Sequence, residues 1–196
     1  MRKIVVINGH PDPLSFNAAI AQSYIQSASD AGSEVRYIAI GSLDFNPNLA
    51  HGYRQRMELE PDLAEALDAI RWSDHQVWIH PLWWLGMPAI MKGFFDRAFL
   101  PGIVFKSNKG SLRKGLLKGR TGRIITTAGD LSENVYEDEY SSSGLIQLQK
   151  GILEYCGVDS IQNTFIGPLY ELNDGDRKKW LEEIASIART DVFASV

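Results

Sequence analysis

A short polar stretch, GHPDPLSFN at residues 9–17, contains residue types that bind a phosphate group. Ser15 can cap a helix, and apolar residues follow from Phe16 onward at helical spacing. The first N–H groups of a helix form an anion site together with the helix dipole. Ser15 and Asn17 add short side-chain donors, and His10 can add a ring N–H. The stretch therefore predicts a site for one phosphate, although an ordinary capped helix start beside a surface histidine would have the same residues.

A second stretch, HPLWWLGMP at residues 80–88, places two tryptophans between an apolar run and the start of a helix. If this stretch lines a crevice, Trp83, Trp84 and Leu85 offer a flat apolar wall for a planar aromatic ligand. The backbone N–H groups of residues 82–85 could then meet polar edges of that ligand. The alternative is that both tryptophans pack into a core or into a contact between subunits.

A third stretch, TTAGDLSENVYEDEYSSSG at residues 126–144, begins with small residues that would let the backbone approach the edge of a ligand. Two tyrosines further along are candidates to cover a pocket or to donate hydrogen bonds. A solvated acidic loop is the alternative, because the segment from 133 to 139 contains four carboxylates. The candidate residues of this stretch are Thr126, Thr127, Ala128, Gly129, Tyr136 and Tyr140.

Strand-like and helix-like segments alternate along the whole chain and would position these three stretches. The strand-like segments are apolar runs without a clear period of two, which is typical of strands covered by helices on both faces. The pattern predicts one α/β domain over residues 1–196, with a doubly wound, five-stranded parallel sheet. The predicted strands are 3–8, 34–40, 76–80, 123–128 and 160–167, and the predicted helices run from Ser15 to Gly32 and over 62–72, 88–99, 144–157 and 176–189, with a long loop over about 100–120.

Ligands of such sheets bind beyond the carboxyl ends of the strands. The loops 8–17, 80–88 and 128–143 leave those ends, so the topology would bring the three stretches together. Together they match a ligand with a phosphate tail and a flat heteroaromatic head, of which flavin mononucleotide (FMN) is an example. Neither a Walker A pattern nor GxGxxG occurs in the chain, which disfavours a nucleoside triphosphate or a Rossmann-type dinucleotide.

The composition is ordinary for a soluble globular protein and argues against several other classes. A net charge of −4 is too small to indicate a protein that binds nucleic acid. One cysteine, Cys156, excludes an internal disulfide framework, and its apolar neighbours predict a buried thiol. No run of residues is long and apolar enough for a secretory signal or a membrane span, so we expect a cytoplasmic protein. We assign no metal ligands.

The chain resembles the flavodoxin-like NAD(P)H:quinone oxidoreductase family. The resemblance is carried by GHPDPLSFN (9–17), HPLWWLGMPAIMKGFFDRAF (80–99), TTAG (126–129) and, more loosely, GILEYCGV (151–158), and the second segment is the most specific. It implies a flavodoxin-like fold with strand order 2-1-3-4-5 and a non-covalently bound FMN or flavin adenine dinucleotide (FAD). The implied activity is the transfer of two electrons from NADH or NADPH to a quinone or a related acceptor.

The resemblance also implies roles for individual residues. It places one group at the flavin phosphate, a second along the isoalloxazine ring and a third at the far edge of that ring. The family is typically dimeric, with each pocket completed by the partner, and a homodimer would bury aromatic surface such as Phe94, Phe95 or Phe99. The three implied groups are His10, Ser15, Phe16 and Asn17, then Pro81, Leu82, Trp83, Trp84 and Leu85, and then Thr126, Thr127, Ala128 and Gly129.

The loop after the fourth predicted strand departs from the pattern of this family. Well-known members have a tyrosine and a histidine there, which are thought to assist proton movement. Tyr136 or Tyr140 is the candidate for the tyrosine, but all four histidines of this chain lie at or before position 80. The histidine of that relay therefore has no counterpart here.

Seven basic and no acidic residues lie between Ala98 and Gly129. They could favour the extra phosphate of NADPH, dock the chain on an anionic partner, or form a solvated loop balanced by acidic residues in 130–139. Docking would fit a rival function, an ancillary subunit of a potassium-efflux system. A second rival is an azo- or nitroreductase, which differs only in its acceptor. The basic residues are Lys106, Lys109, Arg113, Lys114, Lys118, Arg120 and Arg123.

Overall fold

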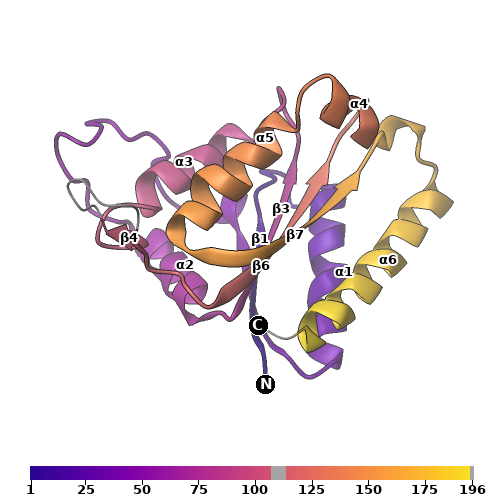
Figure 1. The fold of residues 1–196 in the computed structure, drawn as a ribbon, viewed down its shortest axis with the longest axis horizontal. Helices are drawn as coiled ribbons and strands as arrows, with labels where there is room; N and C mark the ends of the chain where they lie inside the picture. Colours follow the sequence, from indigo (N-terminus) through magenta and orange to yellow (C-terminus); the bar gives the residue numbers. More distant parts are fainter. Residues whose placement is uncertain (107–113, 195–196) are drawn as a thin grey trace.

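The computed structural model describes residues 1–106 and 114–194, with a parallel sheet of five strands and helices on both of its faces (Figure 1). The strand order is β2-β1-β3-β6-β7. Two short strands, β4 and β5, pair with each other outside this sheet. The expected order 2-1-3-4-5 is therefore confirmed, because β6 and β7 are the fourth and fifth strands of the sheet. The five strands are β1 (Lys3–Asn8), β2 (Glu34–Ala39), β3 (His75–Pro81), β6 (Arg120–Thr127) and β7 (Val158–Ile166).

The central apolar runs form strands because helices bury both of their faces. All seven residues of β3 are buried, and so are the last five of β1 and the last seven of β6. Each face of the sheet has its own apolar cluster of side chains. One face is covered by α1 (Phe16–Asp30) and α6 (Asp174–Phe193), and the other by α2 (Pro61–Trp72), α3 (Ala89–Ala98) and the continuous segment of α5 (Ser143–Ile146) and the π-helical η2 (Gln147–Glu154).

Three segments differ from the expected pattern. The expected loop over 100–120 contains an antiparallel pair of short strands. The expected loop over 128–143 contains a short helix, which Ser132 caps by accepting a backbone N–H. The expected helix over 144–157 is mostly π-helical, a rare geometry that is frequent at functional sites. The additional elements are β4 (Phe105–Lys106), β5 (Lys114–Gly115), α4 (Glu133–Asp138) and the 3₁₀ turns η1 (Ile40–Ser42) and η3 (Leu169–Glu171).

The phenylalanine rings at the end of α3 pack inside the protomer. Phe94, Phe95 and Phe99 are 0%, 4% and 8% exposed. The rings of Phe95 and Phe99 lie 5.0 and 6.0 Å from that of Trp78 on β3. Most of the surface of these rings is therefore already buried within the protomer, and only a small part of it is left for the expected dimer interface. Cys156 is buried, as expected, and burial raises the pKa of its thiol to about 12, so the thiol is unreactive at neutral pH.

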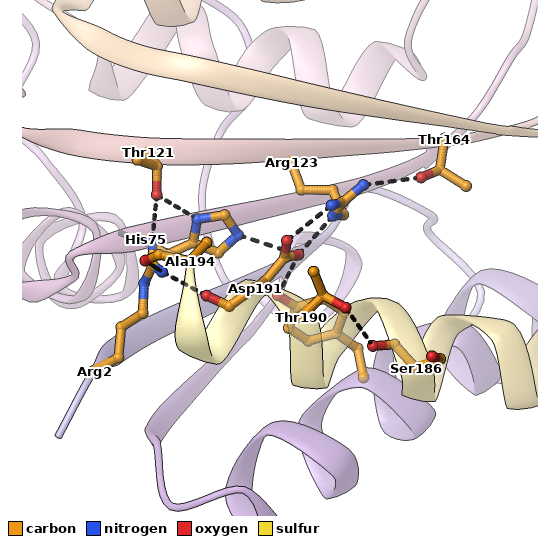
Figure 2. A network of polar contacts seen from close by, with 10 residues as sticks. Arg2, His75, Thr121, Arg123, Thr164, Ser186, Thr190, Asp191 and Ala194 are labelled. Carbon is orange, nitrogen blue, oxygen red and sulfur yellow. Dashed lines mark hydrogen bonds and ion pairs between the residues drawn. The ribbon is translucent and has the colours of Figure 1, made fainter. Parts of the chain in front are cut away.

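A buried polar network ties the C-terminal helix α6 to the amino-terminal end of the sheet (Figure 2). The guanidinium group of Arg123 on β6 donates hydrogen bonds of 2.6 and 2.8 Å to the two carboxylate oxygens of Asp191 on α6. The hydroxyl of Tyr24 donates a third, of 2.9 Å. Burial alone would raise the pKa of Asp191, but the hydrogen bonds from Arg123 and the nearby His75 ring, whose Nε2 lies 3.5 Å from Oδ2, hold it well below its usual value. The network therefore fixes α6 through an ionised carboxylate.

Burial removes one member of the basic run from the surface. Arg123 is 9% exposed and paired with Asp191. Lys118 and Arg120 lie at the amino end of β6, opposite to the edge at which such sheets bind ligands. Lys106 is exposed on β4, and Lys109 and Arg113 lie outside the described residues. No helix within the described residues is long and apolar enough to cross a membrane.

Candidate functional site

The N-terminus of α1 presents unused donors at the expected phosphate end of the site. Ser15 caps the helix, as expected, by accepting the N–H of Ala18 at 3.3 Å. The N–H groups of Phe16 and Asn17 in the first turn have no partner within the described residues. The Asn17 side chain is 2% exposed, and its Oδ1 accepts a 3.0 Å hydrogen bond from the Thr127 hydroxyl. Its Nδ2 has no partner in the described part of the chain, and a buried donor of this kind points to a ligand.

His10 lies in the same loop and contacts the second expected stretch. Its Nδ1 accepts the N–H of Asp12 at 3.0 Å, so the neutral ring carries its proton on Nε2 and has one donor left. Partial burial lowers the pKa of His10, against the opposing effect of the Asp12 carboxylate, so the ring is neutral at pH 7. The imidazole packs edge-on against the indole of Trp83, with ring centroids 5.4 Å apart. The segments 9–17 and 81–85 are therefore neighbours, as the expected topology requires.

Residues 83–86 form a tight and strained turn, which we call the tryptophan hairpin. Trp83 and Gly86 exchange backbone hydrogen bonds of 2.9 and 3.0 Å, and the two residues between them, Trp84 and Leu85, have φ angles of 51° and 61°. Such turns normally use asparagine and glycine, because a positive φ costs a residue with a Cβ roughly 1–2 kcal/mol. The N–H groups of Trp84 and Leu85 have no partner within the described residues, and the Trp84 indole is fully exposed. A strained backbone that also presents free N–H donors and an exposed aromatic ring indicates a binding surface.

The start of α5 packs directly on the tryptophan hairpin. A Cβ at Gly144 would lie 2.2 Å from the carbonyl oxygen of Leu85, so only glycine permits this approach. The hydroxyl of Tyr136 accepts the N–H of Leu145 at 2.9 Å and so anchors α5 to α4. The end of the third expected stretch, residues 126–144, therefore packs against the tryptophan hairpin and supports it.

The two tyrosines expected to be catalytic groups have different environments. Tyr136 is 1% exposed, its ring stacks on Phe165 with centroids 5.5 Å apart, and burial raises the pKa of its hydroxyl. This placement is structural and corrects the expectation that Tyr136 faces a ligand. Tyr140 is 41% exposed in the turn between α4 and α5 and stays a candidate.

Strand β6 continues through Thr127, so the side chains of Thr126 and Thr127 lie inside the protein and not at the surface of the site. Thr126 and Thr127 are 4% and 1% exposed, so only their backbone could approach a ligand. Ala128 is also buried, and its N–H donates to the carbonyl of Ile166 at 2.9 Å. The N–H of Gly129, in contrast, has no partner within the described residues.

Two further residues lie near the site. No pattern in the sequence marks Tyr170, whereas the sequence leaves Arg177 open as a pyrophosphate contact or as a surface arginine of its helix. The Tyr170 ring is 83% exposed and lies beside Gly129, 3.0 Å from the place that a Cβ would take there. The guanidinium group of Arg177 lies over the Phe16 ring, 5.2 Å from its centroid, and donates to the carbonyl of Leu169 at 2.9 Å. Only the path of η3 between β7 and α6 brings these side chains to the site.

The geometry thus gathers three kinds of group at the carboxyl edge of the sheet. Free donors lie at the N-terminus of α1, an exposed indole and two free N–H groups lie on the tryptophan hairpin, and an exposed tyrosine lies beside Gly129. This arrangement suits a ligand with an anionic tail and a planar head. Within residues 1–106 and 114–194, no group of three His, Cys, Asp or Glu side chains could hold a metal ion.

Comparison with known proteins agrees with this geometry. A family model described as a flavodoxin-like fold matches residues 2–188. The chain belongs to this family. An uncharacterized NAD(P)H oxidoreductase of Haemophilus influenzae is 30% identical to it over 97% of this chain and 96% of that protein. The ribosyldihydronicotinamide dehydrogenase (quinone) of Mus musculus is 24% identical over 95% of this chain and 92% of that protein.

Solved structures with a similar fold include a protein of Streptococcus mutans UA159, which has a TM-score of 0.80 and 29% identity over 95% of this chain and 98% of that chain. The NAD(P)H:quinone oxidoreductase of Methanothermobacter marburgensis has a TM-score of 0.78 and 22% identity, covering 96% of this chain and 98% of that chain, which shows the shared fold. The assignment of this flavodoxin-like protein to a family of NAD(P)H oxidoreductases, made from its sequence, is confirmed.

Proposed function

We propose that the protein binds a flavin at the carboxyl edge of its sheet and transfers two electrons, as hydride, from NADH or NADPH to a quinone. The contact between His10 and Trp83 is the observation that carries this proposal, because it joins the phosphate end of the site to its aromatic wall. The relative in Haemophilus influenzae is named an NAD(P)H oxidoreductase, which supports NADH or NADPH as the electron donor. The relative in Mus musculus is named a quinone-dependent dehydrogenase, which supports a quinone as the acceptor.

The residues at the phosphate end fit a flavin phosphate. Leaving a buried donor unpaired costs about 1–3 kcal/mol, which the Asn17 amide would recover by donating to a phosphate oxygen. The N–H groups of Phe16 and Asn17 and the Nε2–H of His10 add further donors. FMN and FAD share this phosphate. FAD has a second phosphate, and the guanidinium group of Arg177, which lies beside Phe16, is a cation that could bind it.

The tryptophan hairpin fits the ring system. When bound, the flavin supplies the two-electron redox chemistry. The Trp84 and Leu85 N–H groups would orient the polar edge of the ring, and the indole of Trp84 would exclude water from one side of the site. The free N–H of Gly129 would stabilise negative charge that develops at the far edge of the flavin ring. The N–H of Ala128 cannot do so, because it already donates to Ile166. Tyr140 would supply the exposed tyrosine hydroxyl of this loop.

The absorption spectrum of the purified protein tests the proposal, followed by mass analysis of the released cofactor. We expect a flavin spectrum and a mass that identifies FMN or FAD. A preparation that stays colourless after incubation with both flavins would overturn the proposal. Turnover with quinones, azo dyes and nitroaromatics then separates a quinone reductase from the azo- and nitroreductase alternatives.

We propose further that the protein is a homodimer in the cytoplasm. A groove of 240 Å³ runs between α3 and η2 and is lined in part by Phe105 and Tyr155, and the ring of Tyr53 at its rim is 80% exposed. A groove lined by aromatic rings, with a largely exposed ring at its rim, would suit a contact with a second copy of the chain. Light scattering after size exclusion should give twice the mass of the chain. Co-purification with a membrane transporter would instead favour the ancillary-subunit alternative.

A further inference from the structure

His80 is a buried polar residue at the base of the tryptophan hairpin, and the roles proposed above do not include it. It is 1% exposed, stands one residue before the end of β3 and pairs in register with Thr126 on β6. Its Nδ1 lies 3.0 Å from the carbonyl oxygen of Pro81. Its Nε2 lies 3.4 Å from the hydroxyl oxygen of Thr126.

These two contacts determine the tautomer of His80. A carbonyl oxygen can only accept a hydrogen bond, so the contact with Pro81 requires a proton on Nδ1. Burial lowers the pKa of His80 to about 4, so the ring is neutral at pH 7 and Nε2 is left as an acceptor. The hydroxyl of Thr126 therefore donates to Nε2, and a directed chain of hydrogen bonds runs from Thr126 through His80 to Pro81.

The carbonyl of Pro81 needs this donor because the neighbouring strand has ended. Carbonyl groups two residues apart on a strand point to the same side. The carbonyl of Ile79 accepts the N–H of Gly9, at the point where β1 ends with Asn8. The next carbonyl on that side of β3 is that of Pro81, which lies beyond the reach of β1 and is satisfied by His80.

The bond from His80 also fixes the peptide unit at which β3 passes into the tryptophan hairpin. The N–H of Leu82 donates to the carbonyl of Thr127 at 2.7 Å, and the Pro81 carbonyl of the same peptide accepts from His80. A peptide unit is planar, so hydrogen bonds at both of its polar groups leave it little freedom to rotate. Trp83 follows directly, so the plane of this peptide sets the direction in which the hairpin leaves the sheet.

We propose that His80 is a positioning residue: it orients the tryptophan hairpin and thereby aims the N–H groups of Trp84 and Leu85 at the flavin. This inference rests on the proposed function, because the flavin is what the hairpin would hold. His80 acts through the backbone, because Pro81 and Thr126 engage both of its ring nitrogens and leave neither for a ligand.

Three substitutions separate this role from the mere filling of space. Asparagine places its amide nitrogen near the position of the histidine Nδ1 and can donate to Pro81. Glutamine reaches the position of Nε2 and meets Thr126 instead, and phenylalanine keeps a ring but removes both bonds. We expect His80→Asn to bind FMN within about twofold of the wild type, and His80→Gln and His80→Phe to bind it roughly tenfold more weakly, because an unpaired carbonyl lets the hairpin turn. Quenching of flavin fluorescence measures the affinity, and thermal unfolding without flavin identifies any variant that does not fold.

A second measurement needs neither flavin nor a variant. ¹⁵N NMR of the flavin-free wild type should show His80 with a proton on Nδ1, none on Nε2, and no titration between about pH 5 and 8. A proton on Nε2, or a titration near the ordinary histidine pKa, overturns the proposal.

The affinities separate the proposal from the proposed function. A wild type that binds neither FMN nor FAD ends both. A wild type that binds FMN, with asparagine and glutamine variants of equal affinity, ends the role of His80 alone.

Discussion

The strain in the tryptophan hairpin leads to a sharp prediction about Trp84. Its indole is fully exposed in the protomer, so truncating it removes no packing, while its φ of 51° is unfavourable for tryptophan and alanine but not for glycine. Glycine relieves a cost of roughly 1–2 kcal/mol and adds about 0.5–1 kcal/mol of backbone entropy to the unfolded chain. Alanine keeps the strain. Trp84→Gly should therefore be more stable than Trp84→Ala by about 0.5–1 kcal/mol, the difference between these two terms.

Thermal unfolding of the flavin-free proteins measures this difference. For a chain of this length, about 1 kcal/mol corresponds to a shift in Tm of roughly 2–4 °C. We expect Trp84→Ala to unfold close to the wild type and Trp84→Gly to unfold about 1–4 °C higher. Both variants should bind FMN at least about tenfold more weakly, because the loss of a stacked ring costs more than 1.4 kcal/mol, a figure that corresponds to roughly tenfold.

Three results would each refute a part of this reasoning. A glycine variant no more stable than the alanine variant would show that the turn is not strained. An unchanged affinity for FMN in both variants would show that Trp84 is not part of the flavin site. A fall in the Tm of Trp84→Ala would show that the indole is buried in an assembly.

Three further predictions follow from other contacts. Asp191→Asn leaves Arg123 with a neutral partner and should lower the free energy of unfolding by about 3–5 kcal/mol at pH 7 in denaturant titrations. Because the folded pKa of Asp191 is depressed, its contribution is present above the unfolded pKa and fades below about pH 4, so the gap between wild type and variant should narrow on acidification. Gly144→Ala must displace the backbone at Leu85 and should weaken FMN binding several-fold, whereas Gly151→Ala, which meets no atom within 4 Å, should not. Arg120→Ala should leave the ratio of kcat/KM for NADPH and NADH unchanged, because Arg120 lies at the far end of the sheet; a changed ratio would restore the basic run as a phosphate site.

Local patterns in the sequence determined the fold and the location of the site. Apolar runs such as 3–8 and 76–80, each followed by a turn and a helical segment, are enough to predict a parallel sheet covered on both faces. Ser15 marks the start of α1 by its own chemistry, since a capping side chain acts within three residues. The rule that ligands bind at the carboxyl ends of strands then selects the three loops.

The tertiary structure alone decided how the residues of these loops are used, because their contacts join segments far apart in the chain. Sequence patterns report spacing along one element, whereas the bond from Asn17 to Thr127 and the contact of Gly144 with Leu85 depend on how several elements pack. The same packing turned Tyr136 inward and placed Tyr170 beside Gly129. It paired Arg123 with Asp191 inside the protein, whereas the sequence alone had counted Arg123 among the surface charges of the basic run. It also assigned His80 a role, since a histidine at a strand end has no meaning until the carbonyl and the hydroxyl that flank it are known.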